Sequence, residues 1–355
     1  MSVVGDGSHA TVLYPGRREP ATVPSALKVV ALGGGTGVPL LLRGLKDVVF
    51  PHASPWRPAA DRDRITAIVT TADDGGSSGR LRRAYRGSAP GDIRNSLLAL
   101  AGTDRALASL FDFRFGGDNE IAGHSLGNLI LAALTHLEGD LVSAVDRAGE
   151  LLGIRGRVVP STIEDVTLSA EFVDGSCIDG ESRIAAVRRA IRQVRLRPEA
   201  AQAAPEAVRA LEAADLVAIG PGSLYTSLIP VLLVRELTEA LARSRARVVL
   251  VMNLMSEPGE TDGYGAVDCL TAIRRHAPEV PIHDVLLNTA PIPRDSLARY
   301  AAEGAQPIRV DVETLHALGC RPIERDVLGD GPKIRHDSRK LARAVLELAT
   351  EVNDE

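Results

Sequence analysis

Short apolar runs that end in glycine-rich or polar segments recur along the chain and predict the strands of one sheet. These runs cover residues 27–32, 65–70, 216–219, 248–252 and 285–287. Their length is that of buried strands, and the runs 27–32 and 216–219 are followed at once by glycine-rich segments. Strand, glycine-rich loop and helix in this order are typical of a parallel sheet that helices cover on both faces. The pattern therefore predicts an α/β fold.

Apolar residues at helical spacing predict the helices. The expected helices cover residues 38–45, 92–100, 125–137, 141–152 and 338–348. Asp337 stands where the N-cap of the last of them is expected. The stretch 158–173 has β-branched character instead, so we expect an inserted helical and mixed lobe, around 102–205, between the two halves of the sheet.

Two segments show no periodicity and are expected to lie outside the regular elements. Residues 1–26 mix Gly, Pro, Ser, Arg and Thr, which predicts a poorly ordered tail. The stretch 50–64 contains three prolines and predicts a long loop between the first helix and the second strand. Residues 27–355 are then expected to form a single domain with its inserted lobe.

Composition indicates which kinds of partner and which cellular compartment to expect. The chain has 355 residues, 45% hydrophobic and 25% charged, with a net charge of -5, so no global basic field favours nucleic acid as a partner. Three widely spaced cysteines argue against structural zinc and against a disulfide framework. No segment has the roughly 20 apolar residues of a membrane span, and the start lacks an apolar signal region. We expect a cytoplasmic protein.

The run 71–83, which follows the second predicted strand, combines acids, glycines, serines and arginines. Glycines let backbone N–H groups approach phosphate oxygens, arginines pair with them, and aspartates hold a hydroxyl group or Mg²⁺. The alternatives are a polar surface turn for the run and an Asx turn for either aspartate. The candidate ligand-binding residues here are Asp73, Asp74, Gly76, Ser77, Ser78 and Arg80.

The loop after the first predicted strand is a candidate phosphate or diphosphate cradle at a helix N-terminus. It consists of Gly33, Gly34, Gly35, Thr36 and Gly37. It resembles a dinucleotide fingerprint, but Val38 stands at the third glycine position and no acid follows at about 20 residues. An NAD-dependent oxidoreductase is therefore the weakest hypothesis, and the missing Lys-Ser or Lys-Thr excludes a P-loop.

Four further polar segments supply candidates at helix starts or strand ends. These candidates are Asp92, Arg94, Asn95, His124, Asn128, Gly220, Gly222, Ser223, Asn253 and Thr261. A helix cap is the alternative for Asp92, a structural histidine for His124, and a cap or turn for Thr261. No serine sits in a GxSxG turn, so a nucleophilic hydrolase lacks support. Several polar loops at strand ends are what a ligand crevice requires.

Six segments together closely resemble the YvcK family, also called the putative gluconeogenesis factors, of the CofD-like superfamily. They are ALGGGTGVPLLLRGLK (31–46), TADDGGSSGRLR (71–82), PGDIRNSLLALA (90–101), GHSLGNLILAAL (123–134), IGPGSLYTSLIPVLLV (219–234) and NLMSEPGETDGY (253–264). The other branch of the superfamily, 2-phospho-L-lactate transferase, moves a phospholactyl or phosphoenolpyruvyl group onto a deazaflavin precursor with magnesium. The resemblance implies a Rossmann-like core.

The resemblance also implies a role. Family members support cell shape, morphogenesis and envelope precursor supply on gluconeogenic carbon sources, and bind UDP-sugars such as UDP-N-acetylglucosamine without a settled enzymatic activity. Tyr300 and Arg335 are similar to positions implicated in that nucleotide-sugar site. Ser338, near Arg335, is considered as a phosphorylation site, with an ordinary first-turn helix residue as the simpler alternative.

Two functions are weighed. The leading hypothesis is a UDP-sugar sensor that regulates envelope synthesis through a protein partner, because no complete set of acid, base and nucleophile is visible. We also expect the protein to form a homo-oligomer. The alternative is a Mg²⁺-dependent transferase in which Asp73 or Asp74 holds the metal and Arg80 neutralises developing charge. His124 is a further candidate catalytic residue.

Overall fold

Seven parallel strands form the main sheet of the computed structural model, which describes residues 26–51, 61–85, 91–102 and 105–350. From one edge to the other the strands are β10 (Arg321–Arg325), β9 (Asp284–Asn288), β8 (Arg247–Val251), β7 (Leu216–Ile219), β1 (Val29–Gly33), β2 (Ile65–Val69) and β3 (Arg157–Pro160). All five expected strands are present close to their expected bounds. The Rossmann-like α/β architecture is confirmed.

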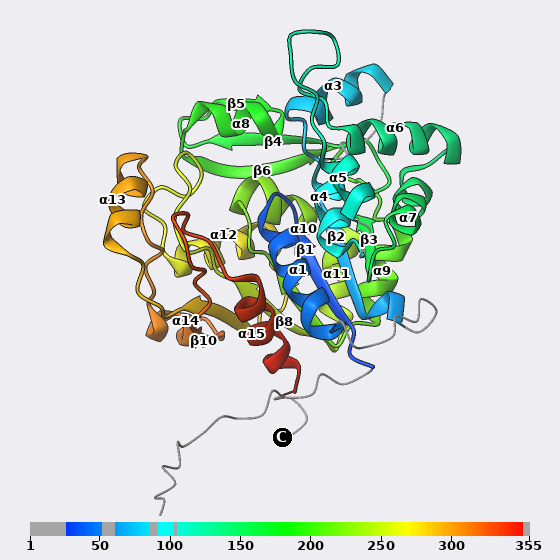
Figure 1. Ribbon diagram of the computed structural model, residues 1–355. Helices are drawn as coiled ribbons and strands as arrows, with labels where there is room; N and C mark the ends of the chain where they lie inside the picture. Colours follow the sequence, from blue (N-terminus) through cyan, green and yellow to red (C-terminus); the bar gives the residue numbers. More distant parts are fainter. Residues whose placement is uncertain (1–25, 52–60, 86–90, 103–104, 351–355) are drawn as a thin grey trace, which may run out of the picture.

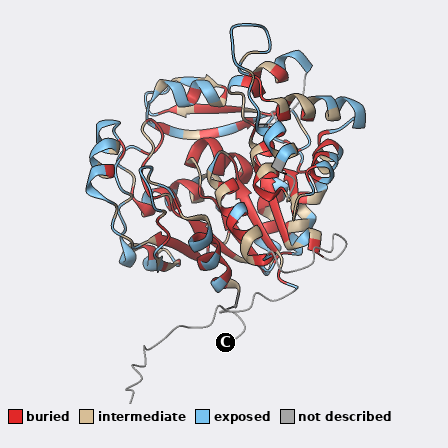
Figure 2. Cartoon of the chain, viewed as in Figure 1, coloured by how far each residue is buried: buried red, intermediate tan, exposed pale blue. Residues whose placement is uncertain are grey.

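Alternate residues of each strand face two separate apolar cores. Val29 and Ala31 of β1 belong to one core, and Val30 and Leu32 to the other. The first core is covered by α1 (Gly37–Val49), α4 (Gly91–Leu100), α7 (Leu141–Leu151) and α15 (Ser338–Thr350). The second is covered by α9 (Pro205–Glu212), α10 (Ile229–Leu232), α11 (Arg235–Arg243) and α12 (Ala266–His276). The result is a three-layer sandwich whose central strands are buried almost throughout (Figure 2).

A small antiparallel sheet forms the inserted lobe (Figure 1). Its order is β5 (Cys177–Asp179), β4 (Thr167–Phe172) and β6 (Ile191–Arg197), and α8 (Glu181–Val187) packs on it. The expected range of 102–205 is broader than this lobe, because β3 within it joins the main sheet by pairing with β2. The β-branched stretch 158–173 is thus divided between two sheets.

The run 71–83 differs from the loop expected from its sequence. Residues Gly76–Tyr85 form helix α3, although glycine and serine are weak helix formers. Tertiary contacts outweigh that preference: Leu81 is buried, and the hydroxyl groups of Ser77 and Ser78 contact His124, in the loop before residues 126–138, and Asn128, in the helix that these residues form. From Gly76 on, the predicted loop is therefore a short, anchored helix.

The start of the last helix, α15, agrees with the sequence-based expectation. Asp337 caps α15, since its carboxylate accepts a hydrogen bond from the Lys340 N–H group at 2.7 Å. Ser338 is the half-buried first residue of that helix, which is the simpler of its two interpretations. Apart from Ala26, the predicted tail lies outside the described residues, as does most of the predicted loop 50–64.

The remaining helices lie around the sheet and its connections. They are α5 (Arg105–Asp112), α6 (Leu126–Glu138), α13 (Arg294–Ala302), α14 (Val312–Ala317) and the short helical turns η1 (Arg62–Arg64) and η2 (Leu224–Leu228). None of the helices in the described part of the chain has the length and apolar character needed to cross a membrane.

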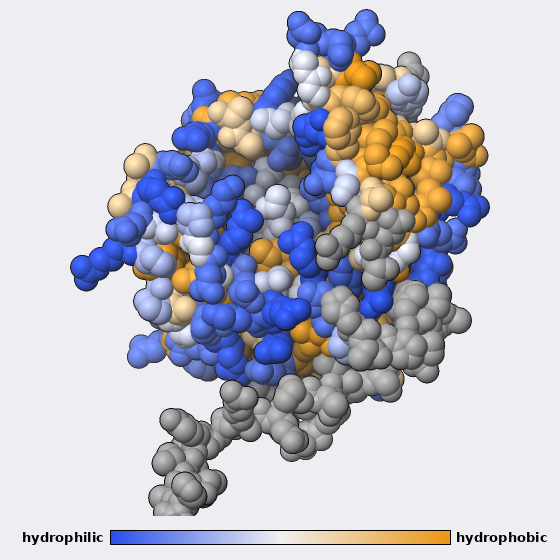
Figure 3. All heavy atoms as spheres, in the orientation of Figure 1, coloured by the Kyte–Doolittle hydropathy of each residue, from blue (hydrophilic) through white to orange (hydrophobic). Residues whose placement is uncertain are grey.

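Apolar side chains gather on the surface over α5 and α6 (Figure 3). Leu110, Phe113 and Leu137 are 52%, 49% and 77% exposed. Surface areas of this kind are typical of contacts with other molecules. The expected homo-oligomer stays a prediction.

Candidate functional site

The two glycine-rich loops meet at the switch point of the sheet. From β1 the chain continues to β2 on one side and later returns to β7 on the other, which leaves a crevice at the carboxyl ends of β1 and β7. The loops touch there, because a Cβ atom on Gly37 would overlap the carbonyl group of Pro221. Glycine at position 37 is therefore required by backbone packing.

Asn253, at the end of β8, clamps the second glycine-rich loop. Its amide Nδ2 donates to the Gly222 carbonyl at 2.8 Å, and its Oδ1 accepts from the Gly222 N–H group at 3.1 Å. Both arms of the side chain are thus bonded to one residue of the loop. Asn253 positions Gly220 to Ser223 at the crevice.

The first glycine-rich loop holds a carboxylate of the protein itself. The carboxylate of Asp92, the second residue of α4, lies against Gly34 and accepts a hydrogen bond from the Gly35 N–H group. Burial, and then the neighbouring charge of Asp73, raise the pKa of Asp92 to about 7. An N–H group that was expected to meet a phosphate is therefore bonded internally.

The adjacent aspartates have different environments. Asp73 accepts from the Gly75 N–H group at 2.8 Å, as an Asx turn does, and bonds to Ser78; burial raises its pKa. Asp74 instead accepts from the Ser182 N–H group at 2.8 Å, in the first turn of lobe helix α8. Asp73 therefore belongs to the crevice, whereas Asp74 attaches the lobe.

Arg94 is the buried cation of the site. It is 6% exposed, and its Nη1 and Nη2 atoms donate to Asn128 Oδ1 at 3.1 Å and to Asn95 Oδ1 at 2.7 Å. Asn128 Nδ2 in turn contacts Ser78 Oγ at 3.5 Å. The Nε atom of Arg94 has no hydrogen-bond partner among the described residues, and neither has Thr71 Oγ1. These are the atoms that a ligand or water would satisfy.

His124 is buried at 8% exposed, and its Nδ1 lies 3.0 Å from Ser77 Oγ. Burial, and then the cations Arg80 and Arg114, lower the pKa of His124, so its ring is neutral at pH 7. Arg80 donates to the Ala122 carbonyl at 2.6 Å, in the loop that carries the histidine. Both residues therefore tie this loop to α3, which matches the structural alternative for His124.

A second part of the site lies beyond β8 and β9. A cavity of about 250 Å³ opens there, lined by apolar side chains such as Leu254 and Leu297 and by two amides, Asn253 and Asn288. Tyr300 packs in the same apolar cluster, and its hydroxyl accepts from the Ile334 N–H group at 3.1 Å. Arg335 follows Ile334 in the chain and is exposed. The two residues named by family resemblance are thus close to one cavity.

The loop after β8 is shaped by internal bonds. Thr261 is 3% exposed, and its hydroxyl accepts from the Glu257 N–H group at 2.8 Å, as in its turn interpretation. Glu260 accepts from Thr226 Oγ1 at 2.6 Å and from the Tyr225 N–H group at 3.1 Å. Burial and the nearby Glu257 raise the pKa of Glu260 to about 7.

Sequence reasoning missed Glu181, the first residue of α8. Burial, followed by the charges of Asp73, Asp92, Asp74 and Glu260, raises its pKa to about 8. No local motif surrounds this residue, and only the folding of the lobe brings it near the crevice. Glu257 and Glu260 stand inside a recognised motif and were detectable from it.

The family model described as 2-phospho-L-lactate transferase CofD matches residues 29–328. The chain belongs to the CofD family. Within it, the chain is similar to the gluconeogenesis factors of Halalkalibacterium halodurans (43% identical; 90% of this chain, 95% of that protein) and Bacillus subtilis (42%; 91% and 98%). A crystal structure of a Bacillus halodurans protein, 42% identical, superposes with a TM-score of 0.83 over 90% of this chain and 99% of that one.

Magnesium, which the transferase branch of the CofD family uses, finds no preformed cage here. No group of three or more His, Cys, Asp or Glu side chains among the described residues is arranged to hold a metal ion. Asp74 is already bonded to α8, which leaves Asp73 as the aspartate of that pair at the crevice.

The raised pKa of Glu181 predicts a pH-dependent gain in stability for Glu181→Gln. The pKa in the folded chain, about 8, lies above the ordinary 4.5, so the ionised carboxylate destabilises the fold most above pH 8 and has no such effect below pH 4.5. We expect the variant to melt above the wild type by about 2–4 °C at pH 8.5, with the difference vanishing towards pH 4.5. Thermal melts across this range, with the exposed Glu199→Gln as control, measure it; equal melting at pH 8.5 would contradict it.

Proposed function

We propose that this protein binds a nucleotide sugar of the UDP-N-acetylglucosamine type at the carboxyl edge of its main sheet and acts as a regulatory gluconeogenesis factor. The observation that carries the proposal is the cavity of about 250 Å³ beside Tyr300, on the same edge as the polar crevice at the switch point. An apolar cavity with a few amides suits a nucleobase and ribose. The adjoining crevice offers polar groups to the rest of such a ligand.

The side chains around the cavity support this ligand class. The ring of Tyr300 offers an aromatic face for uracil or sugar, and the exposed Arg335 is a cation free to approach a diphosphate from solvent. Ser223 follows Gly222, and Asn253, which clamps Gly222, also lines the cavity. The N–H groups of Gly220 and Gly222 are already bonded, to the Leu32 carbonyl and to Asn253 Oδ1, so Ser223 is the polar residue that this loop offers.

A regulatory role is supported by the internal hydrogen bonds that several potential catalytic side chains make. His124 and Arg80 bond to α3 and to the Ala122 carbonyl, and Asp74 bonds to the lobe. The similar proteins of Bacillus subtilis and Halalkalibacterium halodurans are named gluconeogenesis factors. We extend that name to a cytoplasmic role in morphogenesis and envelope precursor supply on gluconeogenic carbon sources, through an envelope-synthesis protein partner.

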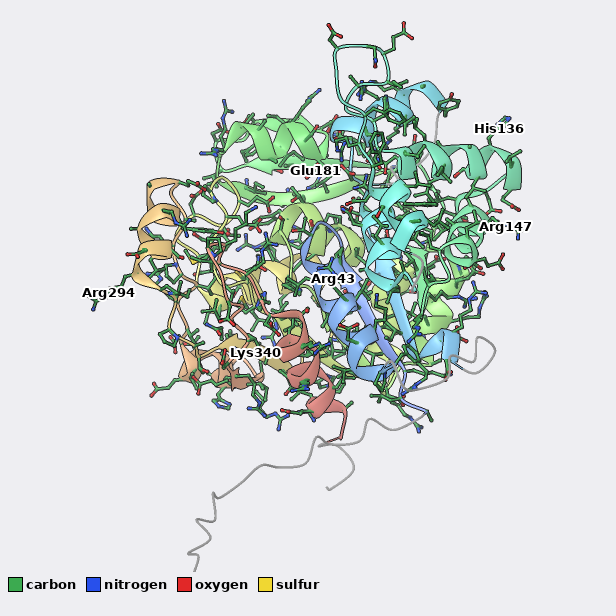
Figure 4. The ribbon with its side chains drawn as sticks, in the orientation of Figure 1. Arg43, His136, Arg147, Glu181, Arg294 and Lys340 are labelled. Carbon is green, nitrogen blue, oxygen red and sulfur yellow. The ribbon has the colours of Figure 1, made fainter. Side chains whose placement is uncertain are left out.

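Calorimetric titration with UDP-N-acetylglucosamine tests the proposal. We expect saturable binding that Tyr300→Ala and Arg335→Ala each weaken at least about tenfold, which is 1.4 kcal/mol. Arg294→Ala is the control, since this arginine is exposed on α13 and points away from the body of the protein (Figure 4). Absence of binding at millimolar ligand, or unchanged affinity in both variants, would refute the nucleotide-sugar site.

A transferase is the second candidate, favoured by the description of the matching family model. It would move a phospholactyl or phosphoenolpyruvyl group, with Asp73 and Arg94 at the transferred group. Mass spectrometry of reactions that contain Mg²⁺, a phosphorylated donor and a deazaflavin precursor would detect the product, and Asp73→Asn would remove it. No product from the wild type would leave the binding protein as the only candidate of the two.

A further inference from the structure

The inserted lobe is fixed over the crevice by contacts with three parts of the main domain. Asp74, after β2, accepts from the Ser182 N–H group of α8 at 2.8 Å. At the other end of α8, Arg188 packs against Gly259 in the loop after β8. The edge of the small sheet is also held, because the Val194 N–H group donates to His276 Nε2 on α12 at 3.0 Å. The lobe therefore forms a roof over the crevice, in contact with the segments that follow β2 and β8.

The start of α8 is the part of the roof closest to β2. A Cβ atom on Gly180 would come within 2.5 Å of Asp74 Oδ2, and Gly180 has φ +102°, so only glycine allows this approach. The next residue is Glu181. Figure 4 shows it at the edge of the lobe where α8 comes near α3. Asp74 thus sets the position of Glu181.

Glu181 interacts with carboxylates that come from both sides of the switch point. Asp73 and Asp92 belong to the β1 and β2 side, and Glu260 belongs to the loop after β8. A side chain within electrostatic range of all three carboxylates lies near the crevice. Loss of solvent and these like charges make the position unfavourable for a carboxylate in the free protein.

Arg94 gives an independent indication that a ligand belongs here. It is more than nine-tenths buried, carries a partnerless Nε–H group, and interacts electrostatically with Asp73 and Asp92. Thr71, which is fully buried two residues before Asp73, has a partnerless hydroxyl group. Buried polar atoms without partners are rare in folded proteins, since each one is unfavourable by about 1–3 kcal/mol.

We propose that the sugar end of the nucleotide sugar binds beneath the lobe, where Asp73, Asp92 and Glu181 accept its hydroxyl groups and Arg94 Nε donates to one of its oxygens. The inference rests on the proposed function and adds the orientation of the bound ligand, that is, which end lies beneath the lobe and which end lies in the cavity. The nucleoside lies in the cavity beside Tyr300, and the diphosphate crosses the second glycine-rich loop.

The chemistry of the two regions favours this direction over its reverse. Three neighbouring acids repel a diphosphate, whereas hydroxyl groups both donate to carboxylates and accept from protonated carboxyls. Because the pKa is about 7 for Asp92 and about 8 for Glu181, the protonated and the ionised forms of these side chains are both accessible near neutral pH. The cavity beyond β9 lacks such a set of acids among its lining residues and is mostly apolar.

Titration of Glu181→Ala with UDP-N-acetylglucosamine and with UDP separates the sugar contact from the rest of the site. We expect affinity for the nucleotide sugar to fall at least about tenfold, while affinity for UDP stays within about twofold of the wild type. Asp73→Asn should show the same selective loss. Tyr300→Ala should weaken both ligands, and Glu199→Ala, an exposed acid that follows β6 of the same lobe, should weaken neither.

Each other outcome overturns the inference in a distinct way. Unchanged affinity for UDP-N-acetylglucosamine in Glu181→Ala and Asp73→Asn places the sugar elsewhere, and an equal loss for both ligands assigns the acids to the shared nucleotide. In either case Tyr300→Ala still reports on the nucleotide site. If the wild type binds neither UDP nor the sugar nucleotide, the proposed function fails and the inference fails with it. Melting curves of every variant confirm that the fold is retained.

Discussion

Replacing Asp284 by alanine is expected to lower the free energy of unfolding by about 3 kcal/mol, the low end of the range for a broken buried ion pair. Asp284 is fully buried at the start of β9. It accepts hydrogen bonds from Arg247 Nη2 and Arg321 Nε, each at 2.9 Å, at the starts of β8 and β10. Alanine would leave two partly buried guanidinium groups without this carboxylate, and the side-chain hydrogen bonds that join β9 to β8 and β10 would be lost.

The pH dependence of this effect follows from the pKa of Asp284. Burial by itself would raise the pKa, but the hydrogen bonds and charges of the two arginines hold it below its ordinary value. The stabilisation is therefore present above the unfolded pKa of about 4 and is lost as pH falls through the lower folded value. Urea unfolding of wild type and Asp284→Asn should show a difference at pH 7 that shrinks below about pH 4.

A control separates this buried group from ordinary surface charge. Glu239 pairs with Arg235 one helical turn away on α11, and both side chains are solvent-exposed. Glu239→Ala is expected to change the free energy of unfolding by at most about 0.5 kcal/mol. An Asp284→Ala variant no less stable than Glu239→Ala would show that the arginines are solvated well enough without their partner.

Introducing a single methyl group at Gly37 is expected to disrupt the site and the fold together. In Gly37→Ala the new Cβ atom would overlap the carbonyl of Pro221 and press on the Gly222 N–H group, both of which are backbone. Backbone cannot rotate away as a side chain does, so the two glycine-rich loops must separate. We expect a loss of about 3 kcal/mol in unfolding free energy, the upper end for overpacking, and loss of UDP-N-acetylglucosamine binding.

Gly116 provides the matched control for this substitution. A Cβ atom placed there meets no heavy atom of the described residues within 4 Å, and the residue is absent from those with positive φ. Gly116→Ala should therefore leave both unfolding and ligand titration unchanged. If Gly37→Ala behaves like Gly116→Ala in both measurements, the contact between the glycine-rich loops is not required for the site.

The sequence predicted single elements well where the signal was local. The apolar runs predicted β7 and its neighbours, because a buried strand needs only a few consecutive apolar residues. β10 was missed because Arg321–Arg325, at a sheet edge, consists of three charged residues, a proline and a single isoleucine, so no apolar run marks it. Helix α3 was missed because Ser77 and Ser78 are weak helix formers whose stabilising partners come from residues 124 and 128.

The candidate site was predicted in part for the same reason. The residues named from loops at strand ends do line one edge of the sheet, since parallel strands all end on that edge. Their individual roles were not visible, because a motif does not say which atom bonds to which. Asn253 is an example: its amide is bonded to Gly222 on both arms and acts as a clamp.

The sequence by itself determined the α/β class, the five central strands, the glycine-rich loops and the family, because periodicity, strand length and motif order are local properties of the chain. Only the tertiary structure decided that Asp73 faces the crevice while Asp74 holds α8, and that Glu181 joins the site across 108 residues of sequence from the loop after β2. The physical reason is that hydrogen bonds and charge interactions between distant segments depend on how the lobe packs over the sheet. Neighbouring residues with the same side chain then acquire different roles.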